Sequence, residues 1–232
     1  MKKRNNGVLY LVSTPIGNLG DISFRGVEIL SAVSLIAAED TRHSKRLLMH
    51  YNINTKLISY FEHNKLSRIP VLIDHIKNGN DLALITDAGT PGISDPAYRI
   101  VRQAIKESIE VVSLPGPSAV ITALVISGLP TDRFIFEGFL PPKKGRGKRI
   151  KDVKDIDATL IYFESPHRVG KTLVQLYEIL GDRPVVIARE LTKKYQEIKR
   201  GTLAVFSEYY NNVKVKGEVV ILIGKNDSNV YF

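Results

Sequence analysis

The chain of 232 residues contains no cysteine, which excludes disulfide bonds and thiolate metal sites and is compatible with a reducing compartment. Its five histidines lack the spacing of metal ligands, so we predict no metal site. No apolar run approaches the roughly 20 residues of a membrane span. The apolar run at 8–12, after the basic first residues, is too short for a signal peptide. We therefore expect a soluble cytoplasmic protein with no membrane contact.

Acidic residues are in deficit, with 24 Asp and Glu against 33 Lys and Arg and a formal net charge of +9. This excess favours a phosphate-rich partner or an anionic surface, and it serves solubility equally well. Hydrophobic residues make up 44% of the chain, enough to build apolar cores. At about 150 residues per domain, the length fits one large domain or two small ones.

In the first half of the chain, short apolar runs alternate with amphipathic stretches, a rhythm that predicts parallel strands joined by helices. We place one helix at 42–50 with Thr41 as its N-cap, and another that Asp95 and Pro96 begin. The predicted strands cover 8–12, 35–38, 57–60, 82–86 and 111–114.

After residues 115–117 the chain has more strands per helix, which predicts a mixed sheet. The domain boundary is expected near Gly116, giving domains over 8–116 and 117–225. Residues 143–154 are basic and contain glycine, so we expect a loop that leads into a short helix. The remaining elements are strands at 134–139, 159–163, 185–188 and 218–223 and helices at 118–126, 169–180 and 202–210.

Three predicted strand ends carry glycine, proline and small polar residues, at 13–21, 86–96 and 114–119. Ligands of open parallel sheets bind beyond the carboxyl ends of strands, and glycine lets the backbone approach them closely. One such loop is more often only a turn, but three at neighbouring strand ends indicate a binding site. Two nucleotide motifs are excluded, because Pro15 replaces the first glycine of a dinucleotide fingerprint and Ser165 replaces that of a phosphate-binding loop.

Two charged clusters, 39–43 and 188–194, directly follow predicted strands. Charges in such places often belong to sites, and helix capping and surface ion pairs explain them about equally well.

These segments together resemble the tetrapyrrole-methylase superfamily and, within it, the ribosomal RNA small-subunit methyltransferase I family. The matching segments follow one another in order along most of the chain. They are residues 14–19, 38–42, 87–96, 115–119, 163–168, 188–193 and 200–203.

The resemblance implies an α/β, two-domain tetrapyrrole-methylase-like fold. Its N-terminal domain holds a parallel sheet, its C-terminal domain a mixed sheet, and the cofactor cleft lies between them. The resemblance also implies a homodimer that binds S-adenosyl-L-methionine. The implied reaction is 2′-O-methylation of a cytidine ribose in the decoding region of small-subunit (16S) rRNA. The partner is either the free rRNA or the assembled small subunit.

Carried over by position, the cofactor site consists of apolar walls, a few polar groups and backbone amides. Such a site suits an adenine face, a zwitterionic methionine end and a positive sulfonium. Asp95 is expected to be a helix cap rather than a ligand. The implied cofactor residues are Pro15, Ile16, Asp87, Gly89, Thr90, Ile93, Ser118, Ala119, Phe163, Ala188 and Glu218.

Methyl transfer to a ribose hydroxyl needs the two reactants positioned and the hydroxyl deprotonated, so a base or a stabilising cation helps. The two charged clusters offer candidates for that chemistry, and the sequence does not rank them. The candidates are Glu39, Asp40, Arg42, Arg189, Glu190 and Lys193.

The basic stretch 143–154 is either a solvated loop or a mobile arm that meets rRNA phosphates. Two rival functions stay open. One is methylation of a tetrapyrrole or another small molecule by the same fold, against which residues 14–17 and 87–91 argue, because those relatives carry glycine-rich first loops. The other is RNA binding without catalysis, which predicts no affinity for S-adenosyl-L-methionine.

Overall fold

The computed structural model describes residues 6–227 and 229–232, which divide into two compact units. The first unit ends at Ser118 and the second begins at Ala119. The domain limits 8–116 and 117–225 remain predictions. No helix among the described residues is both long and apolar enough to cross a membrane.

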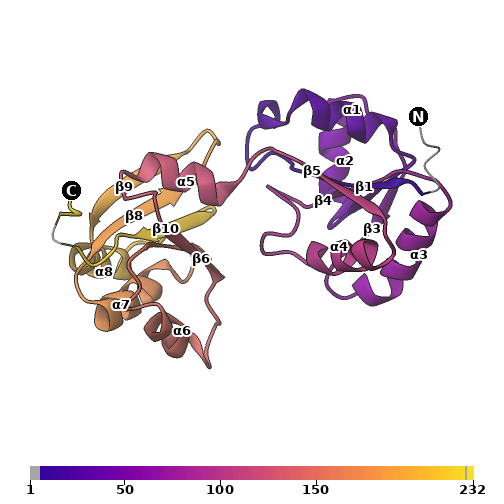
Figure 1. Ribbon diagram of the computed structural model, residues 1–232. Coiled ribbons are helices and arrows are strands. Elements are labelled where there is room, and N and C mark those ends of the chain that lie inside the picture. The colour runs from indigo at the N-terminus through magenta and orange to yellow at the C-terminus, as the bar shows by residue number, and fades with distance from the viewer. Residues whose placement is uncertain (1–5, 228) are drawn as a thin grey trace. The chain divides into compact units, whose positions relative to one another are not determined.

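The first unit is a doubly wound α/β domain (Figure 1). Its five strands are all parallel, in the order β3-β2-β4-β1-β5, as the alternation of strand and helix patterns predicted. The elements are β1 (Val8–Val12), the 3-10 helix η1 (Leu19–Asp21), α1 (Phe24–Ala32), β2 (Leu35–Ala38), α2 (Thr41–His50), β3 (Leu57–Ser59), α3 (Lys65–Lys77), β4 (Leu82–Ile85), α4 (Ala97–Lys106) and β5 (Glu110–Leu114).

The central strand β4 shows why this sheet takes helices on both faces. All four of its residues are buried, and alternate side chains point to opposite sides of a strand. Leu82 and Leu84 pack with residues of α3 and α4, whereas Ala83 and Ile85 pack with residues of α1 and α2. Fully burying one such leucine contributes about 1.5–3 kcal/mol. The continuous apolar run therefore requires a layer of helices on each face.

Two helix starts in this unit differ in detail from the sequence prediction. The N-cap of α2 is Asp40 rather than Thr41, because the Asp40 carboxylate accepts a hydrogen bond of 2.8 Å from the Arg42 amide. Helix α4 begins at Ala97, whose amide donates to the Asp95 carboxylate at 2.8 Å. The N-cap position is therefore Pro96, and Asp95, one residue earlier, accepts the hydrogen bond of the first helical amide, in line with the predicted role of Asp95 in capping free N–H groups.

The second unit contains a mixed sheet in the order β6-β7-β10-β8-β9. Only the β6–β7 pair of this sheet is parallel, so the predicted mixed sheet is confirmed. The elements are α5 (Ala119–Ser127), β6 (Phe134–Phe139), α6 (Arg146–Asp152), β7 (Thr159–Glu164), α7 (Val169–Leu180), β8 (Pro184–Arg189), β9 (Glu197–Thr202), α8 (Leu203–Asn211) and β10 (Val219–Ile223).

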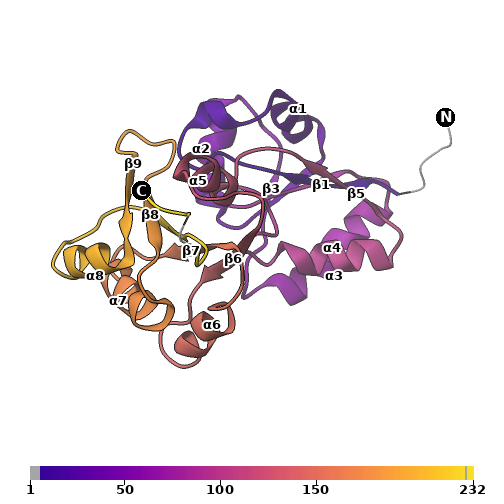
Figure 2. The ribbon, with the colours of Figure 1, turned by 60° about the vertical axis from the view of Figure 1, so that its left-hand side comes forward.

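Helices α6, α7 and α8 cover one face of this second sheet, and α5 contacts the other over β8 and β10 (Figure 2). The edge strand β9 was not predicted from the sequence. It carries the polar residues typical of an edge strand and none of its residues is fully buried, so it lacks the apolar run by which the other strands were found. Helix α8 follows it, capped by the Thr202 hydroxyl.

Candidate functional site

Three loops meet at one edge of the first sheet, where β4, β1 and β5 are neighbours and end side by side. Thr14 after β1 and Gly89 after β4 exchange two backbone hydrogen bonds of 2.9 and 3.0 Å. The hydroxyls of Ser13 and Thr90 lie 3.0 Å apart, and Thr90 donates to the Pro117 carbonyl at 3.1 Å. The prediction that the three loops lie at neighbouring strand ends is confirmed.

Glycine permits this close approach at two positions. Gly89 has a φ of +88°, a conformation that favours glycine. At Gly116, an added Cβ would come within 2.7 Å of the Ser13 Cβ, so no larger residue allows the third loop to lie against the first. The loops are thus joined by both hydrogen bonds and van der Waals contact, which gives them a fixed mutual geometry.

The charged cluster after β2 lies beside the loop that follows β4. The Thr86 hydroxyl donates to the Glu39 carboxylate at 2.8 Å, and the Asp40 amide donates to the Asp87 carboxylate at 3.0 Å. The structure therefore brings Glu39 and Asp87, taken from two separate sequence motifs, to the same edge of the sheet.

Two of the remaining residues in this unit have clear local roles. Asp95 accepts hydrogen bonds from the amides of Gly92 and Ala97, which closes the loop before α4, and burial raises the pKa of its carboxyl. Ile93, inside the same loop, leaves 48% of its surface exposed. An exposed isoleucine beside glycine-rich backbone is available to a ligand.

In the second unit, two predicted cofactor residues share one row of the sheet. Phe163 on β7 and Ala188 on β8 both lie directly opposite Val220 on β10, so the three side chains point to the same face. The Phe163 ring packs edge-on against Phe136 and Phe139, with ring centres 4.8 and 5.5 Å away. This shared row follows from the strand pairing, which an apolar run alone does not reveal.

The charged cluster after β8 is joined by its own contacts. The Glu190 carboxylate accepts from the Lys193 ammonium at 3.0 Å and from the Glu218 amide at 2.9 Å. Lys193 also pairs with the Glu218 carboxylate at 3.1 Å, and Arg189 pairs with Glu197 at 3.3 Å. Three predicted site residues, Glu190, Lys193 and Glu218, are therefore in direct contact.

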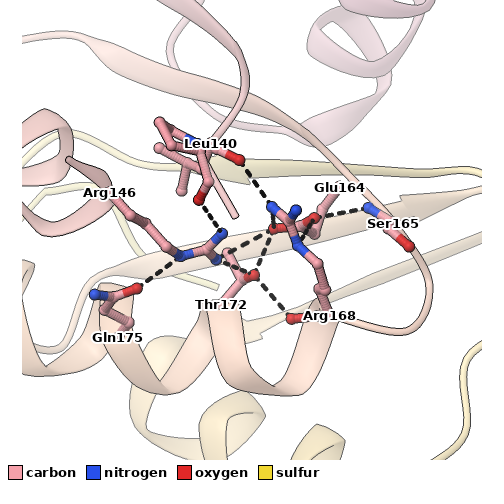
Figure 3. A network of polar contacts seen from close by, with 8 residues as sticks. Leu140, Arg146, Glu164, Ser165, Arg168, Thr172 and Gln175 are labelled. Atoms are coloured by element: carbon pink, nitrogen blue, oxygen red, sulfur yellow. Dashed lines mark hydrogen bonds and ion pairs between the residues drawn. The ribbon is translucent and has the colours of Figure 1, made fainter. Parts of the chain in front are cut away.

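The basic stretch 143–154 contains a loop that leads into a short helix, as predicted. It includes the helix α6, and its Arg146 is 4% exposed, with its guanidinium paired to the buried Glu164 at 3.2 Å. Figure 3 shows this contact within a larger network. Arg146 was missed as a buried residue because its partner lies 18 positions away in the sequence.

Comparison with known proteins identifies the family. The family model of tetrapyrrole (corrin/porphyrin) methylases matches residues 8–206. A ribosomal RNA small subunit methyltransferase I of Halalkalibacterium halodurans is 49% identical over 230 residues, which cover 99% of this chain and 80% of that protein. The protein of the same name from Vibrio cholerae is 47% identical over 93% of this chain and 76% of its own length. This chain belongs to the ribosomal RNA small subunit methyltransferase I family.

Solved structures confirm the tetrapyrrole-methylase fold of this family member. Diphthine synthase superposes with a TM-score of 0.73 at 16% identity, covering 94% of this chain and 90% of that one. Cobalt precorrin-4 methyltransferase, a cobalamin biosynthetic enzyme, superposes with a TM-score of 0.69 at 17% identity, covering 93% and 94% of the two chains.

The first charged cluster of this methyltransferase-family chain contains two carboxyls with different environments. A hydrogen bond from the Arg42 side chain, followed by one from its amide, lowers the pKa of Asp40 to about 2. The Arg42 side chain is 89% exposed and pairs with Asp40 at 2.9 Å. Asp40 is therefore occupied as a cap and is a weak proton acceptor. Glu39, which accepts one hydrogen bond through a single carboxylate oxygen, is the better candidate base.

The second cluster combines paired charges with an unusual backbone. The hydrogen bond from the Glu218 amide, and then the contact with Lys193, lower the pKa of Glu190. Burial alone lowers the pKa of Lys193, but its hydrogen bonds with Glu190 and Glu218 outweigh burial and raise it. Glu190 and Thr192 have φ angles of 52° and 63°, left-handed values that are rare for residues other than glycine and cluster at functional sites.

Within residues 6–227 and 229–232, no group of three or more His, Asp or Glu residues is arranged to hold a metal ion.

Proposed function

We propose that this protein is an S-adenosyl-L-methionine-dependent methyltransferase acting on a cytidine 2′-oxygen in the decoding region of small-subunit (16S) rRNA. The observation that carries the proposal is near-full-length identity of 49% and 47% with proteins named ribosomal RNA small subunit methyltransferase I. The physical support is the set of three joined loops at the strand ends of the first sheet, where ligands of parallel sheets bind.

The residues at these loops suit the methyl donor, which would supply a methyl group on a positively charged sulfur. Glu39 and Asp87 provide negative charge at the same edge, while Gly89 holds the first two loops together and Ile16 and Ile93 are apolar. Apolar walls with a few placed polar groups are typical of small-molecule sites. The proposed contacts remain Pro15, Ile16, Asp87, Gly89, Thr90, Ile93, Ser118, Ala119, Phe163, Ala188 and Glu218.

The charged clusters would serve the acceptor hydroxyl. Glu39 would accept its proton, since the Glu39 carboxylate is only partly engaged by Thr86. Arg42, with its largely exposed guanidinium, would stabilise the developing negative charge on oxygen. Arg189, Glu190 and Lys193 are paired with neighbouring residues, as Arg42 is with Asp40, but their side chains are at most 26% exposed, so we assign them first to positioning.

The same proposal includes the partners. The RNA substrate is either free small-subunit rRNA or the assembled subunit, the enzyme works in the cytoplasm, and it acts as a homodimer, which the family resemblance implies. Methylation of a tetrapyrrole is the alternative, and it rests on structural likeness at 15–17% identity, which concerns the fold alone.

The deciding experiment follows transfer of a labelled methyl group from S-adenosyl-L-methionine. The acceptors are purified small ribosomal subunits, free small-subunit rRNA and uroporphyrinogen. We expect transfer to an RNA-containing acceptor only. Substrate RNA with one 2′-deoxycytidine at the target keeps its base edges and phosphates but lacks the nucleophile, so it should bind and accept no methyl group. Transfer to that RNA would make the acceptor a base atom, and transfer to uroporphyrinogen alone would replace the proposed substrate.

Single-turnover rates of four variants test the charged clusters: Glu39→Gln, Arg42→Ala, Glu190→Gln and Lys193→Ala. A base or charge stabiliser acts mainly in the transition state, so Glu39→Gln and Arg42→Ala should lower the rate more than they lower RNA or cofactor affinity. The matched control is Glu28→Gln on the exposed side of α1. If all four variants keep the wild-type rate, positioning alone carries the chemistry and neither cluster is catalytic.

A further inference from the structure

Exposed lysines concentrate on and around α6. Lys143, Lys144, Lys148 and Lys151 are exposed, and Lys171 on α7 is exposed as well. In the described part of the chain these five ammonium groups, here called the α6 lysine surface, have no carboxylate within ion-pair distance. Like charges without internal partners repel one another, and an anion that binds across them relieves that repulsion.

An open groove of about 700 Å³ adjoins this surface. Its polar lining residues are Lys143, Arg146 and Lys171, the amides Gln175 and Asn211, and one acidic residue, Glu178. The volume falls in the range of roughly 300–1,000 Å³ that ligand sites occupy. Ammonium and amide donors suit phosphate and sugar oxygens, which make up half or more of the contacts in protein–nucleic acid complexes.

A buried network fixes the position of the basic segment (Figure 3). At its centre, the Glu164 carboxylate, with only 1% of its side chain exposed, is paired with Arg146 at 3.2 Å and with Arg168 at 3.0 Å. Glu164 also accepts from the Thr172 hydroxyl at 2.5 Å and from the Ser165 amide at 2.8 Å. Burying charges is costly unless each is paired and hydrogen-bonded, a condition that these contacts satisfy.

The two arginines of this network hold the start of the segment before α6, and Arg146 is itself the first residue of α6. Arg168 donates to the Leu140 carbonyl at 2.8 Å, and Arg146 donates to the Pro141 carbonyl at 3.4 Å. Arg146 also donates to Gln175 on α7 at 2.7 Å and contacts the Thr172 hydroxyl. Residues 142–145, which carry Lys143 and Lys144, therefore run between two anchored points.

We infer that the α6 lysine surface is a fixed phosphate-binding platform for the RNA substrate, positioned by the buried Arg146–Glu164–Thr172 network. The inference rests on the proposed function for the identity of the polyanion. It assigns Arg146 and Glu164 as positioning residues that do not touch RNA, and it assigns the phosphate contacts to the lysines alone.

The first test compares two triple variants with equal loss of charge. Lys143→Ala, Lys148→Ala and Lys171→Ala change the platform. Lys56→Ala, Lys106→Ala and Lys214→Ala are the matched control, since these lysines are exposed and form no ion pair among the described residues. Affinity for a labelled transcript of small-subunit rRNA is measured between about 50 and 300 mM KCl, where each phosphate contact to a single strand contributes about 0.7 to the slope of log K against log salt.

We expect the platform variant to flatten this slope by about 2 and the control variant to leave it unchanged, with S-adenosyl-L-methionine affinity and circular dichroism as in the wild type. Equal slopes for the two triple variants would overturn the inference. The inference would also be overturned if the platform variant lost binding to phosphatidylglycerol vesicles but kept the wild-type salt slope for RNA, because the surface would then bind a membrane.

The second test addresses the positioning network by hydrogen exchange. In Arg146→Gln, we expect the α6 amides to exchange at least tenfold faster, with weaker RNA binding and unchanged cofactor affinity. If Arg146 instead contacts a phosphate, exchange stays as in the wild type and the salt slope falls by about 0.7. Thr172→Val removes one hydroxyl and no charge, so it provides the same exchange measurement if Arg146→Gln does not fold. Unchanged exchange in the folded variant refutes the positioning role.

Failure of the proposed function gives a different result. A wild-type protein that transfers no methyl group to RNA contradicts the proposed function. A wild-type protein that methylates RNA, with a platform variant that matches its control in slope and rate, contradicts only the inference about the α6 lysine surface.

Discussion

Gly89 joins the first two loops of the proposed cofactor site. Replacing it by alanine, beside a matched control, distinguishes the conformational strain of the backbone from a direct effect on cofactor binding. Its φ is +88°, and its backbone exchanges hydrogen bonds of 2.9 and 3.0 Å with Thr14. An added Cβ would lie 3.5 Å from Ile16 Cγ2 and 3.7 Å from the Pro117 carbonyl oxygen, both ordinary contacts. The cost of Gly89→Ala to the free protein is therefore conformational, about 1–2 kcal/mol.

Gly92 provides the matched control within the same loop. Its φ is +96°, and no atom lies within 4 Å of an added Cβ. Gly92→Ala thus carries a similar conformational cost and points its methyl group into open space. Both variants should lower Tm by roughly 2–8 °C. Only Gly89→Ala places a methyl group between two of the joined loops, so we expect it alone to weaken S-adenosyl-L-methionine binding by about tenfold or more, which is about 1.4 kcal/mol.

Calorimetric titration of the wild type and both variants, with thermal unfolding measured on the same samples, decides the matter. Alanine is the better probe than valine, because β-branched side chains tolerate a positive φ least well and would disturb the loop itself. Wild-type affinity in folded Gly89→Ala would remove this loop from the cofactor site. Equal losses of affinity in the two variants would show that backbone strain, not contact, causes the effect.

Three further outcomes follow from local geometry. In Gly170→Ala the new Cβ would come within 2.4 Å of the Tyr210 carbonyl oxygen, so we expect urea unfolding to show a free energy of unfolding lower by about 1–3 kcal/mol. The control is Gly147→Ala, whose new Cβ has its nearest contact at 3.7 Å and should leave the stability unchanged or raise it. Thr202→Ala removes the hydroxyl that caps α8 and should lower the free energy of unfolding by about 1 kcal/mol. Thr202→Ser keeps a hydroxyl and should retain most of the wild-type stability, so equal stability of the alanine and serine variants would contradict the cap. Glu190 has a folded-state pKa below its ordinary value of 4.5, so its stabilising contribution is complete above that pH and is lost as pH falls through the lowered pKa. The Tm difference between wild type and Glu190→Gln should therefore be constant near neutrality and shrink below pH 4.5, and a difference that grows on acidification would refute this assignment.

The strand-end loops could be located from sequence because the rule that governs them is topological. Alternating apolar runs and amphipathic stretches predict parallel strands, and parallel strands place the residues after each strand at one edge. Residues as distant in sequence as Ser13 and Thr90 thereby come within 3.0 Å. No side-chain detail was needed for this prediction.

Details that depend on a specific partner were beyond the sequence. The choice between Asp40 and Thr41 as N-cap depends on which residue takes extended dihedral angles, and both types are good caps. Strand β9 is polar at most positions and is defined by its pairing with β8 rather than by its own pattern. Arg146 looks like its basic neighbours in the sequence, and only the buried carboxylate of Glu164 distinguishes it.

The net positive charge of the chain therefore does not give the number of contacts that the protein can make with the phosphates of a nucleic acid. The basic side chains of this protein differ in the free energy that is needed to release them from their present contacts so that they can bind a phosphate. Arg146 is buried, and to bind a phosphate it would have to leave Glu164, a buried carboxylate that would then keep only Arg168 as its ion-pair partner. Lys193 would have to leave two carboxylates. Lys143 and Lys148 have no such partner among the described residues, so binding a phosphate costs them only water and side-chain freedom. Phosphate binding should therefore fall to the lysines that the fold leaves unpaired, and the salt dependence of RNA affinity should count those lysines rather than the full charge of the segment.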